Sequence, residues 1–265
     1  MGTKKIIVLY AIVAVGSALA VGWIFSYVGR GAPGPKGLTT SVLFIGNSLT
    51  YVNDLPQTLS DIARSLGDTA ETDMYAPGGY TLKQDAQDPT ALDKIASRPW
   101  DFVVLQEQSE LPALQDSQVD DEVTPYALEL ASDVRQAGPD TKVVFFETWA
   151  YKGGDPQYCA STPTLCDFES MQDQLSRSYG LLAQRSGGLL APVGEAWRSA
   201  RDAYPEIELY QSDGRHPSAE GTYLAAAVFY MVLFKKDVAG AASLGIDPAQ
   251  AKILQQVARQ VVFRQ

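Results

Sequence analysis

Short apolar runs alternate with longer segments of helical periodicity from residue 40 onward. The runs that we expect to be strands are residues 41–45, 70–75, 101–105, 141–147 and 189–193. The run at 141–147 is wholly apolar in its middle, which is typical of a parallel strand buried on both faces. The pattern therefore predicts an α/β protein whose parallel sheet of about five strands is covered by helices on both sides.

The segments between these runs predict helices. Asp54, Leu55 and Pro56 are typical of an N-cap followed by proline in the first turn, so we expect a helix from there to about Leu66. The other expected helices are residues 126–136, 168–184, 218–235 and 247–259. Residues 108–121 are expected to form a long loop.

The first 30 residues are predicted to be a targeting or anchoring segment. Lys4 and Lys5 precede a run from Ile6 to Val28 that carries no charge, and about 20 such residues suffice to cross a bilayer. An Ala-Leu-Ala sequence at 18–20 leaves a cleaved signal peptide as the alternative to a membrane anchor. Either way the remaining chain is expected to be extracytoplasmic, because the lysines precede the span.

Residues 31–39 are expected to be a flexible linker rich in glycine and proline, and residues 40–265 one folded domain. The whole chain has a net charge of −10. Residues 1–37 hold four basic and no acidic side chains, which leaves 17 basic and 31 acidic side chains, a net charge of −14, for residues 38–265. This balance excludes nucleic acid as a partner, since phosphate binding needs a basic surface, and it favours neutral substrates.

The chain has two cysteines, Cys159 and Cys166, seven residues apart in a loop that contains proline and threonine. In an oxidising compartment this pair predicts a local disulfide. A zinc site is a poor alternative because the sequence holds no second pair of cysteines. We therefore expect no metal.

The candidate chemistry depends on the only histidine, His216, which follows Asp213 by three residues. Ser48 stands directly after the first expected strand. An acyl-transfer site needs a hydroxyl nucleophile, an imidazole that takes its proton, and a carboxylate that orients the imidazole. Ser48, His216 and Asp213 are the candidates for these three roles, and this chemistry needs no cofactor.

Four sequence blocks occur in an order that resembles the SGNH (GDSL-like) hydrolases, a family of serine esterases and lipases. They are Gly-Asn-Ser-Leu-Thr at 46–50, Pro-Gly-Gly-Tyr-Thr-Leu at 77–82, the strand and polar residues at 100–109, and Asp-Gly-Arg-His-Pro at 213–217. The resemblance implies a flavodoxin-like three-layer α/β/α sandwich. It also implies an oxyanion hole built from the backbone N–H groups of Ser48 and Gly79.

The third block departs from the family pattern, in which an asparagine donates its side-chain amide to the oxyanion. Here Gln106 and Gln108 stand after the strand, and we expect Gln106 to be the donor, with Gln108 as the substitute. Glu107 between them is expected to be a solvated loop charge. Ser48, Gly79 and Gln106 each follow a strand, and the carboxyl ends of parallel strands are where such sheets bind ligands.

The resemblance to carbohydrate-esterase branches implies hydrolysis of short acyl esters, with acetyl favoured, on a polysaccharide or glycoside. Candidate substrate-binding residues are Asn47, Trp149 and Tyr210, although Asn47 also suits a brace of the serine turn and aromatic rings are often core residues. The alternatives are a sugar O-acetyltransferase or a lipase with the same three residues, and a membrane-tethered glycan-binding module without catalysis. The partners expected are a small-molecule or glycan ester, and a membrane through the N-terminal segment only.

Overall fold

The computed structural model describes residues 37–263. Its core is a sheet of five parallel strands in the order β2-β1-β3-β4-β5. The strands are β1 (Thr39–Ile45), β2 (Thr69–Tyr75), β3 (Phe102–Leu105), β4 (Lys142–Phe146) and β5 (Leu189–Ala191). This confirms the predicted fold class and the approximate place of every expected strand.

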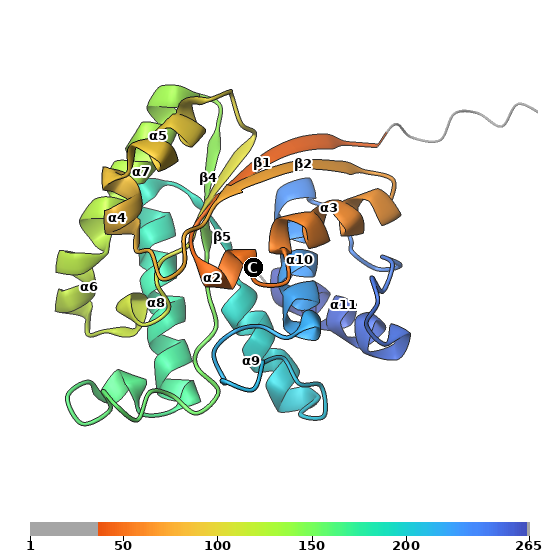
Figure 1. Ribbon diagram of the computed structural model, residues 1–265. Helices are drawn as coiled ribbons and strands as arrows, with labels where there is room; N and C mark the ends of the chain where they lie inside the picture. The colour runs from red at the N-terminus through yellow and green to blue at the C-terminus, as the bar shows by residue number, and fades with distance from the viewer. Residues whose placement is uncertain (1–36, 264–265) are drawn as a thin grey trace, which may run out of the picture. The chain divides into compact units, whose positions relative to one another are not determined.

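Helices cover both faces of the sheet, as Figure 1 shows. One layer holds α3 (Leu55–Ser65), α9 (Val193–Ala203), α10 (Ala219–Phe234) and α11 (Pro248–Val262). The other layer holds α4 (Leu82–Gln87), α5 (Pro89–Ala96), α6 (Asp116–Glu122), α7 (Thr124–Ala137) and α8 (Phe168–Ser186). The protein is therefore a three-layer α/β/α sandwich.

Successive strand residues belong to opposite cores, because side chains alternate along a strand. Phe44 and Phe146 pack with α3, α9, α10 and α11, whereas Ile45 and Phe145 pack with the helices on the other side. This is why the strands read as continuous apolar runs rather than as an alternating pattern. Helix α10 is buried along its length, so it shows no polar face either.

Short polar motifs start the helices that the sequence predicted. The Asp54 side chain accepts the Gln57 N–H at the start of α3, and the Ser218 side chain accepts the Gly221 N–H at the start of α10. Both caps satisfy an N–H group that has no partner inside the helix. Because Ser218 follows His216 by two residues, this cap also fixes the end of the loop that carries Asp213 and His216, called the histidine loop below.

The structure differs from the sequence-based prediction mainly in short helices. Helices α4 and α5 were not expected, because each is too short to display an apolar stripe, and they begin on the caps Thr81 and Asp88. The expected loop 108–121 holds a 3₁₀ turn, Leu111–Ala113, and most of α6. The expected strand 189–193 ends at Ala191, since α9 begins directly afterwards at Val193.

The disulfide between Cys159 and Cys166 is present, as predicted. It closes a loop that follows β4 and precedes α8. Within residues 37–263, none of the helices combines the length and the apolar character that crossing a membrane requires. The predicted anchor or signal peptide at 1–30, and all but the end of the predicted linker at 31–39, lie outside the described residues.

Candidate active site

Ser48, His216 and Asp213 form one hydrogen-bonded chain. The Ser48 Oγ lies 2.9 Å from Nε2 of His216, and Nδ1 of His216 lies 2.6 Å from Oδ2 of Asp213. A carboxylate accepts only, so Nδ1 carries the proton and Nε2 is left to accept the serine hydroxyl proton. The three candidates from the sequence, which are 168 residues apart at most, thus meet in the order that acyl transfer requires.

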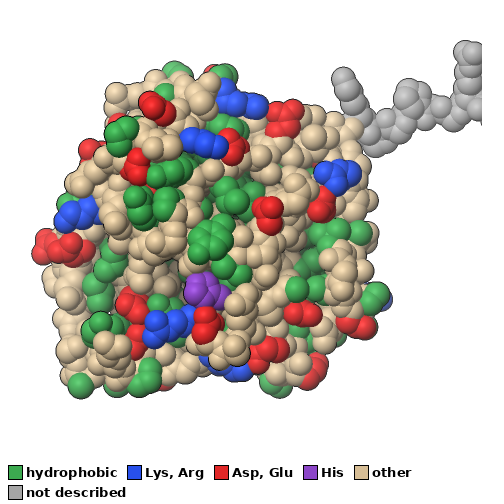
Figure 2. All heavy atoms as spheres, viewed as in Figure 1, with side chains coloured by type: hydrophobic (Ala, Val, Ile, Leu, Met, Phe, Trp, Pro, Cys, Tyr) green, Lys and Arg blue, Asp and Glu red, His purple; other side chains and the backbone are tan. Residues whose placement is uncertain are grey.

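Two elements bring these residues together. Ser48 is the first residue of α2 (Ser48–Tyr51), which starts three residues after β1 ends. Asp213 and His216 lie in the turn before α10, where Gly214 has a φ of +67° that favours glycine. Figure 2 shows the only histidine at the surface, with charged side chains beside it, so a substrate can reach it from solvent.

Asn53 joins the two elements and was not identified from the sequence. Its Nδ2 donates to the carbonyl oxygens of Pro217 and Ser218 and to the Thr222 hydroxyl, at 2.9–3.0 Å. Its φ of +57° lies in the left-handed region that asparagine tolerates better than most residues. Asn53 therefore fixes the segment after Ser48 against the segment after His216.

Asp213 is held in its ionised form. Burial raises its pKa, but hydrogen bonds from the His216 ring and from the backbone N–H groups of Arg215 and His216 outweigh burial and lower the pKa to about 2. The carboxylate is therefore charged at neutral pH. A permanent negative charge here orients the imidazole and stabilises it once it has taken the serine proton.

Two backbone N–H groups beside Ser48 have no acceptor among the described residues. Ser48 opens α2, so its own N–H has no partner within the helix. Gly79 lies in a turn closed by the Tyr80 N–H and the Pro77 carbonyl, with a φ of +73°, and its N–H is also unused by residues 37–263. These are the two N–H groups that the family resemblance implied for the oxyanion hole.

Gln106 does not suit the oxyanion role that the sequence suggested. Its side chain is completely buried; Oε1 accepts from the Asn47 N–H and the Thr50 hydroxyl, and Nε2 donates to the Glu107 carbonyl. A β-carbon on Gly46 would lie only 2.5 Å from Oε1, so Gly46 leaves the space that this amide fills. Gln106 instead supports the turn that carries Ser48.

Gln108 is the glutamine that remains partly exposed. Its Oε1 accepts from the N–H groups of Glu110 and Leu111, which orients the amide, whereas its Nε2 has no acceptor among residues 37–263. An oriented amide with a free N–H is the kind of donor that an oxyanion hole uses. Of the two glutamines, Gln108 is therefore the one whose side-chain N–H groups have no acceptor within residues 37–263, and it stays the candidate donor.

The three residues expected to bind substrate are buried and serve the framework. Asn47 donates from Nδ2 to the Tyr80 carbonyl and accepts the Leu49 N–H, so it braces the serine turn against the Gly79 turn. The indole of Trp149 stacks on Trp197 with ring centroids 3.9 Å apart. Neither ring is open to a substrate, which corrects the expectation for Trp149.

Trp149 and Tyr210 contact the backbone of the histidine loop and support it. The Trp149 Nε1 donates to the Arg215 carbonyl at 2.9 Å. The buried Tyr210 donates its hydroxyl to the Ala150 carbonyl at 2.7 Å and lies opposite Pro217 in an isolated backbone bridge. The sequence placed both rings near the site, but they contact the backbone of its loops and not the substrate space.

The structure also corrects the expectation for Glu107, which is fully buried and is not a solvated loop charge. Its Oε1 accepts the N–H groups of Leu82, at 3.1 Å, and of Gln108, at 2.6 Å. It thereby ties the start of α4, just after the Gly79 turn, to the loop that carries Gln108. No sequence signal distinguished this buried acid from an exposed one.

Asp85 in α4 lies in the same buried region, and both of its carboxyl oxygens lack a partner among residues 37–263. Burial, together with the charges of Glu107 and Asp88, raises the pKa of Asp85 to about 8. Burial also raises the pKa of Glu107 to about 7, although the two N–H groups that it accepts oppose the shift. The carboxyl groups of Asp85 and Glu107 therefore retain protons to near-neutral pH. They lie next to the Gly79 turn and the loop that carries Gln108, which we call the oxyanion loops.

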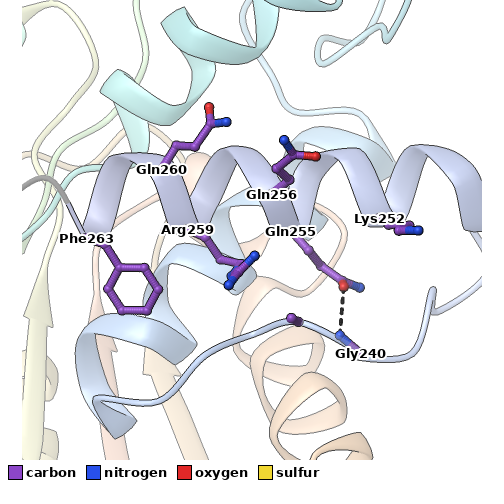
Figure 3. A pocket seen from close by; sticks show the side chains of 8 residues that line it. Gly240, Lys252, Gln255, Gln256, Arg259, Gln260 and Phe263 are labelled. Carbon is purple, nitrogen blue, oxygen red and sulfur yellow. Dashed lines mark hydrogen bonds between the residues drawn. The ribbon is translucent and has the colours of Figure 1, made fainter.

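A separate cavity of about 500 Å³ lies over α11, far along the chain from the triad residues. Figure 3 shows Lys252, Gln256, Arg259 and Gln260 projecting from α11, and Gln255 bonded to Gly240 in the loop before it. None of the candidate catalytic residues lines this cavity. No group of side chains within residues 37–263 is arranged to hold a metal ion.

Comparison with known proteins finds relatives through structure alone, since no family model and no curated protein matches the sequence. A DUF4886 family protein from Bacteroides uniformis is similar at a TM-score of 0.74 and 21% identity, over 85% of this chain and 95% of that one. A candidate SGNH hydrolase from Slackia heliotrinireducens is similar at a TM-score of 0.60 and 28% identity, over 74% and 99%. Axe2, an acetylxylan esterase from Geobacillus stearothermophilus, is similar at a TM-score of 0.52 and 20% identity, over 78% and 99%.

Proposed function

The chain belongs to the SGNH (GDSL-like) hydrolase superfamily, and on that premise we propose that it is a serine esterase that removes short acyl groups, acetyl foremost, from a carbohydrate. The observation that carries the proposal is the continuous hydrogen-bonded chain from Ser48 through His216 to Asp213. It is joined by the N–H groups of Ser48, at the start of α2, and of Gly79, in the turn that Asn47 ties to α2; neither has an acceptor among residues 37–263.

The proposed reaction has two halves. His216 takes the proton from Ser48 Oγ as the oxygen attacks the ester carbonyl carbon, and the resulting oxyanion is met by the N–H groups of Ser48 and Gly79 and by the Gln108 amide. His216 then gives its proton to the leaving alcohol, and an acyl-serine remains. Water, activated by the same imidazole, attacks the acyl-serine and releases the acid, which restores the serine hydroxyl.

The carbohydrate part of the proposal is supported by two facts. The similar structure of Axe2 belongs to an acetylxylan esterase, and the net charge of −14 over residues 38–265 suits a neutral substrate. The extracytoplasmic part is supported by the uncharged run from Ile6 to Val28 and by the disulfide, which is typical of oxidising compartments.

The test is to incubate the full chain with a fluorophosphonate, to locate the adduct by peptide mass spectrometry, and to measure acetate release from acetylated xylan. We expect an adduct on Ser48, loss of acetate release with labelling, and neither adduct nor release for Ser48→Ala. The melting temperature of Ser48→Ala should match that of the parent, because its hydroxyl bonds only His216 among the described side chains. A folded parent protein that is neither labelled nor active would refute the proposal.

A further inference from the structure

One exposed aromatic ring borders the triad and has no role in the mechanism above. Among residues 37–263, the exposed large hydrophobic side chains are Leu38, Tyr51, Tyr158, Leu244 and Phe263. Single exposed apolar side chains are normal on a protein surface, so exposure alone says little. Tyr51 differs from the others in its place, because it follows the candidate nucleophile by three residues.

Helix α2 fixes where this ring lies. It is a single turn, Ser48–Tyr51, and residues three apart on a helix share one face. Tyr51 is 43% exposed, and its hydroxyl oxygen would lie 3.4 Å from a β-carbon on Gly78. The ring therefore stands on the nucleophile's side of the helix and reaches the turn that carries the Gly79 N–H.

The ring is not needed to complete the core. Its hydroxyl makes no hydrogen bond with residues 37–263, unlike the buried tyrosines Tyr210 and Tyr223, whose hydroxyls bond backbone carbonyls. Hydrophobic side chains also gather at the surface around the histidine in Figure 2. A large, rigid aromatic face beside Ser48 is thus left open to whatever the site binds.

The surroundings indicate what chemistry would use that face. A tyrosine ring offers a flat amphipathic surface at a low entropic cost, which suits the C–H face of a pyranose. The half-exposed Arg215 guanidinium, beside His216 and stacked on the Tyr151 ring 4.4 Å away, provides N–H donors for hydroxyl groups. An acetyl group is too small to cover a tyrosine ring, whereas a sugar ring matches its size.

We propose that Tyr51 is the platform on which the sugar ring of a neutral acylated glycan stacks while its ester group reaches Ser48. This inference rests on the proposed esterase function and names the residue that makes the site prefer glycan esters to simple alkyl esters. The acyl group and the oxyanion contacts are independent of it. Tyr51 is thus a specificity-determining residue of the alcohol side of the substrate.

The test measures kcat and KM for two esters, an acetylated xylo-oligosaccharide and methyl acetate, by acetate release in a pH-stat. Methyl acetate is chosen because p-nitrophenyl acetate carries an aromatic ring that could itself stack on Tyr51. The quantity compared is the ratio of kcat/KM for the glycan ester to kcat/KM for methyl acetate. The variants of the full chain are Tyr51→Ala, Tyr51→Phe and, as a control with an exposed aromatic ring away from the triad, Phe263→Ala.

We expect Tyr51→Ala to lower the ratio about tenfold, which corresponds to about 1.4 kcal/mol of lost binding, and to do so through KM for the glycan ester. Tyr51→Phe keeps the ring and should keep most of the ratio, and Phe263→Ala should leave the ratio at the parent value. An unchanged ratio in Tyr51→Ala would overturn the inference. So would a change in the preference for acetyl over longer acyl esters at an unchanged ratio, since that would place the ring on the acyl side.

Failure of the proposed function has a different signature. A parent protein that hydrolyses neither ester refutes the esterase assignment before Tyr51 is considered. A parent that hydrolyses methyl acetate and the glycan ester with equal kcat/KM leaves the esterase assignment intact and refutes only the platform, because no preference for glycan esters then exists.

Discussion

Asp213 and Asp85 belong to two regions of the site that shift the pKa of a carboxyl group in opposite directions. Asp213 lies in the open histidine loop, accepts three hydrogen bonds and has a pKa lowered to about 2. Asp85 lies in the buried region under the oxyanion loops, has no hydrogen-bond partner among residues 37–263 and has a pKa raised to about 8. The residue type is the same, so the difference in pKa comes from the surroundings: burial and the charges of Glu107 and Asp88 raise the pKa of Asp85, whereas hydrogen-bond donors lower that of Asp213.

The site thus keeps its charged carboxylate and the buried carboxyl groups that support its loops in different regions. In the open loop, oriented N–H groups hold a negative charge where the imidazolium will form. In the buried region, burial and the charges of Glu107 and Asp88 raise the pKa of Asp85, and Glu107 accepts the N–H groups of Leu82 and Gln108. The proposed chemistry belongs to the first region, and the second region fixes the loops that surround it.

The largest effect should come from neutralising the open carboxylate. Asp213→Asn should lower kcat by about 10⁴-fold, because the amide can no longer hold the His216 tautomer that accepts the Ser48 proton. The loss should be smaller than that of His216→Ala, since a misoriented imidazole keeps some basicity. Acetate-ester kinetics on both variants would check this, and an Asp213→Asn variant within tenfold of the parent would remove Asp213 from the triad.

Substitutions of the two glutamines on either side of Glu107 distinguish an oxyanion donor from a residue that supports the Ser48 turn. Gln108→Ala should lower kcat about 10²–10³-fold with little change in KM or melting temperature, as the loss of one oxyanion donor does. Gln106→Ala should instead lower the free energy of unfolding by about 1–3 kcal/mol, because the Asn47 N–H and the Thr50 hydroxyl would be buried without an acceptor. Kinetics and urea denaturation of both variants separate these effects, and the reverse outcome would restore Gln106 as the donor.

The buried carboxyl group should make stability depend on pH. The folded-state pKa of Asp85, about 8, exceeds its ordinary value of 3.8, so the folded protein binds a proton that the unfolded chain releases between these values. Its contribution is full below about pH 4 and is lost as the pH rises to about 8, by up to about 1.4 kcal/mol per pH unit. Urea denaturation from pH 5 to 8.5 should show a shallower decline for Asp85→Asn than for the parent.

Asp213 is the opposite case. Its folded-state pKa is lowered, so its contribution is present above its ordinary value of 3.8 and is lost as the pH falls toward about 2. The titration of Asp213 itself therefore adds nothing to the decline between pH 5 and 8.5. If Asp85→Asn and the parent show the same pH dependence, Asp85 is not protonated in the folded state.

The smallest effect on kcat should come from the support of the histidine loop. Trp149→Phe removes the Nε1 donor to the Arg215 carbonyl but keeps an aromatic ring near Trp197. We expect the free energy of unfolding to fall by about 1–3 kcal/mol and kcat to fall less than tenfold. A loss of kcat as large as that of Asp213→Asn would give Trp149 a direct role in the reaction.

The sequence by itself determined the order of strands and long helices, because apolar runs and capping residues are local signals. It also selected Ser48, Asp213 and His216, since a chain with one histidine offers one imidazole base and Asp213 lies three residues from it. Gly79 could be named because the block at 77–82 resembles the family block whose glycine offers its N–H, and the structure gives Gly79 a positive φ. The short helices α4, α5 and α6 were missed because none is long enough to show a periodic stripe. Helix α9 was missed although it is as long as α3 and buries Val193, Ala196 and Ala200 at helical spacing.

Which polar and aromatic side chains are buried and which remain exposed near Ser48 could not be predicted from the sequence and became clear from the folded structure. Gln106 and Gln108 are chemically identical, and two residues of chain separate a buried brace from a partly exposed amide. Trp149, Tyr210 and Glu107 likewise read as site residues or surface charge, and folding buries all three. Burial depends on how helices from distant parts of the chain close over a strand end, so no local pattern of residues can encode it.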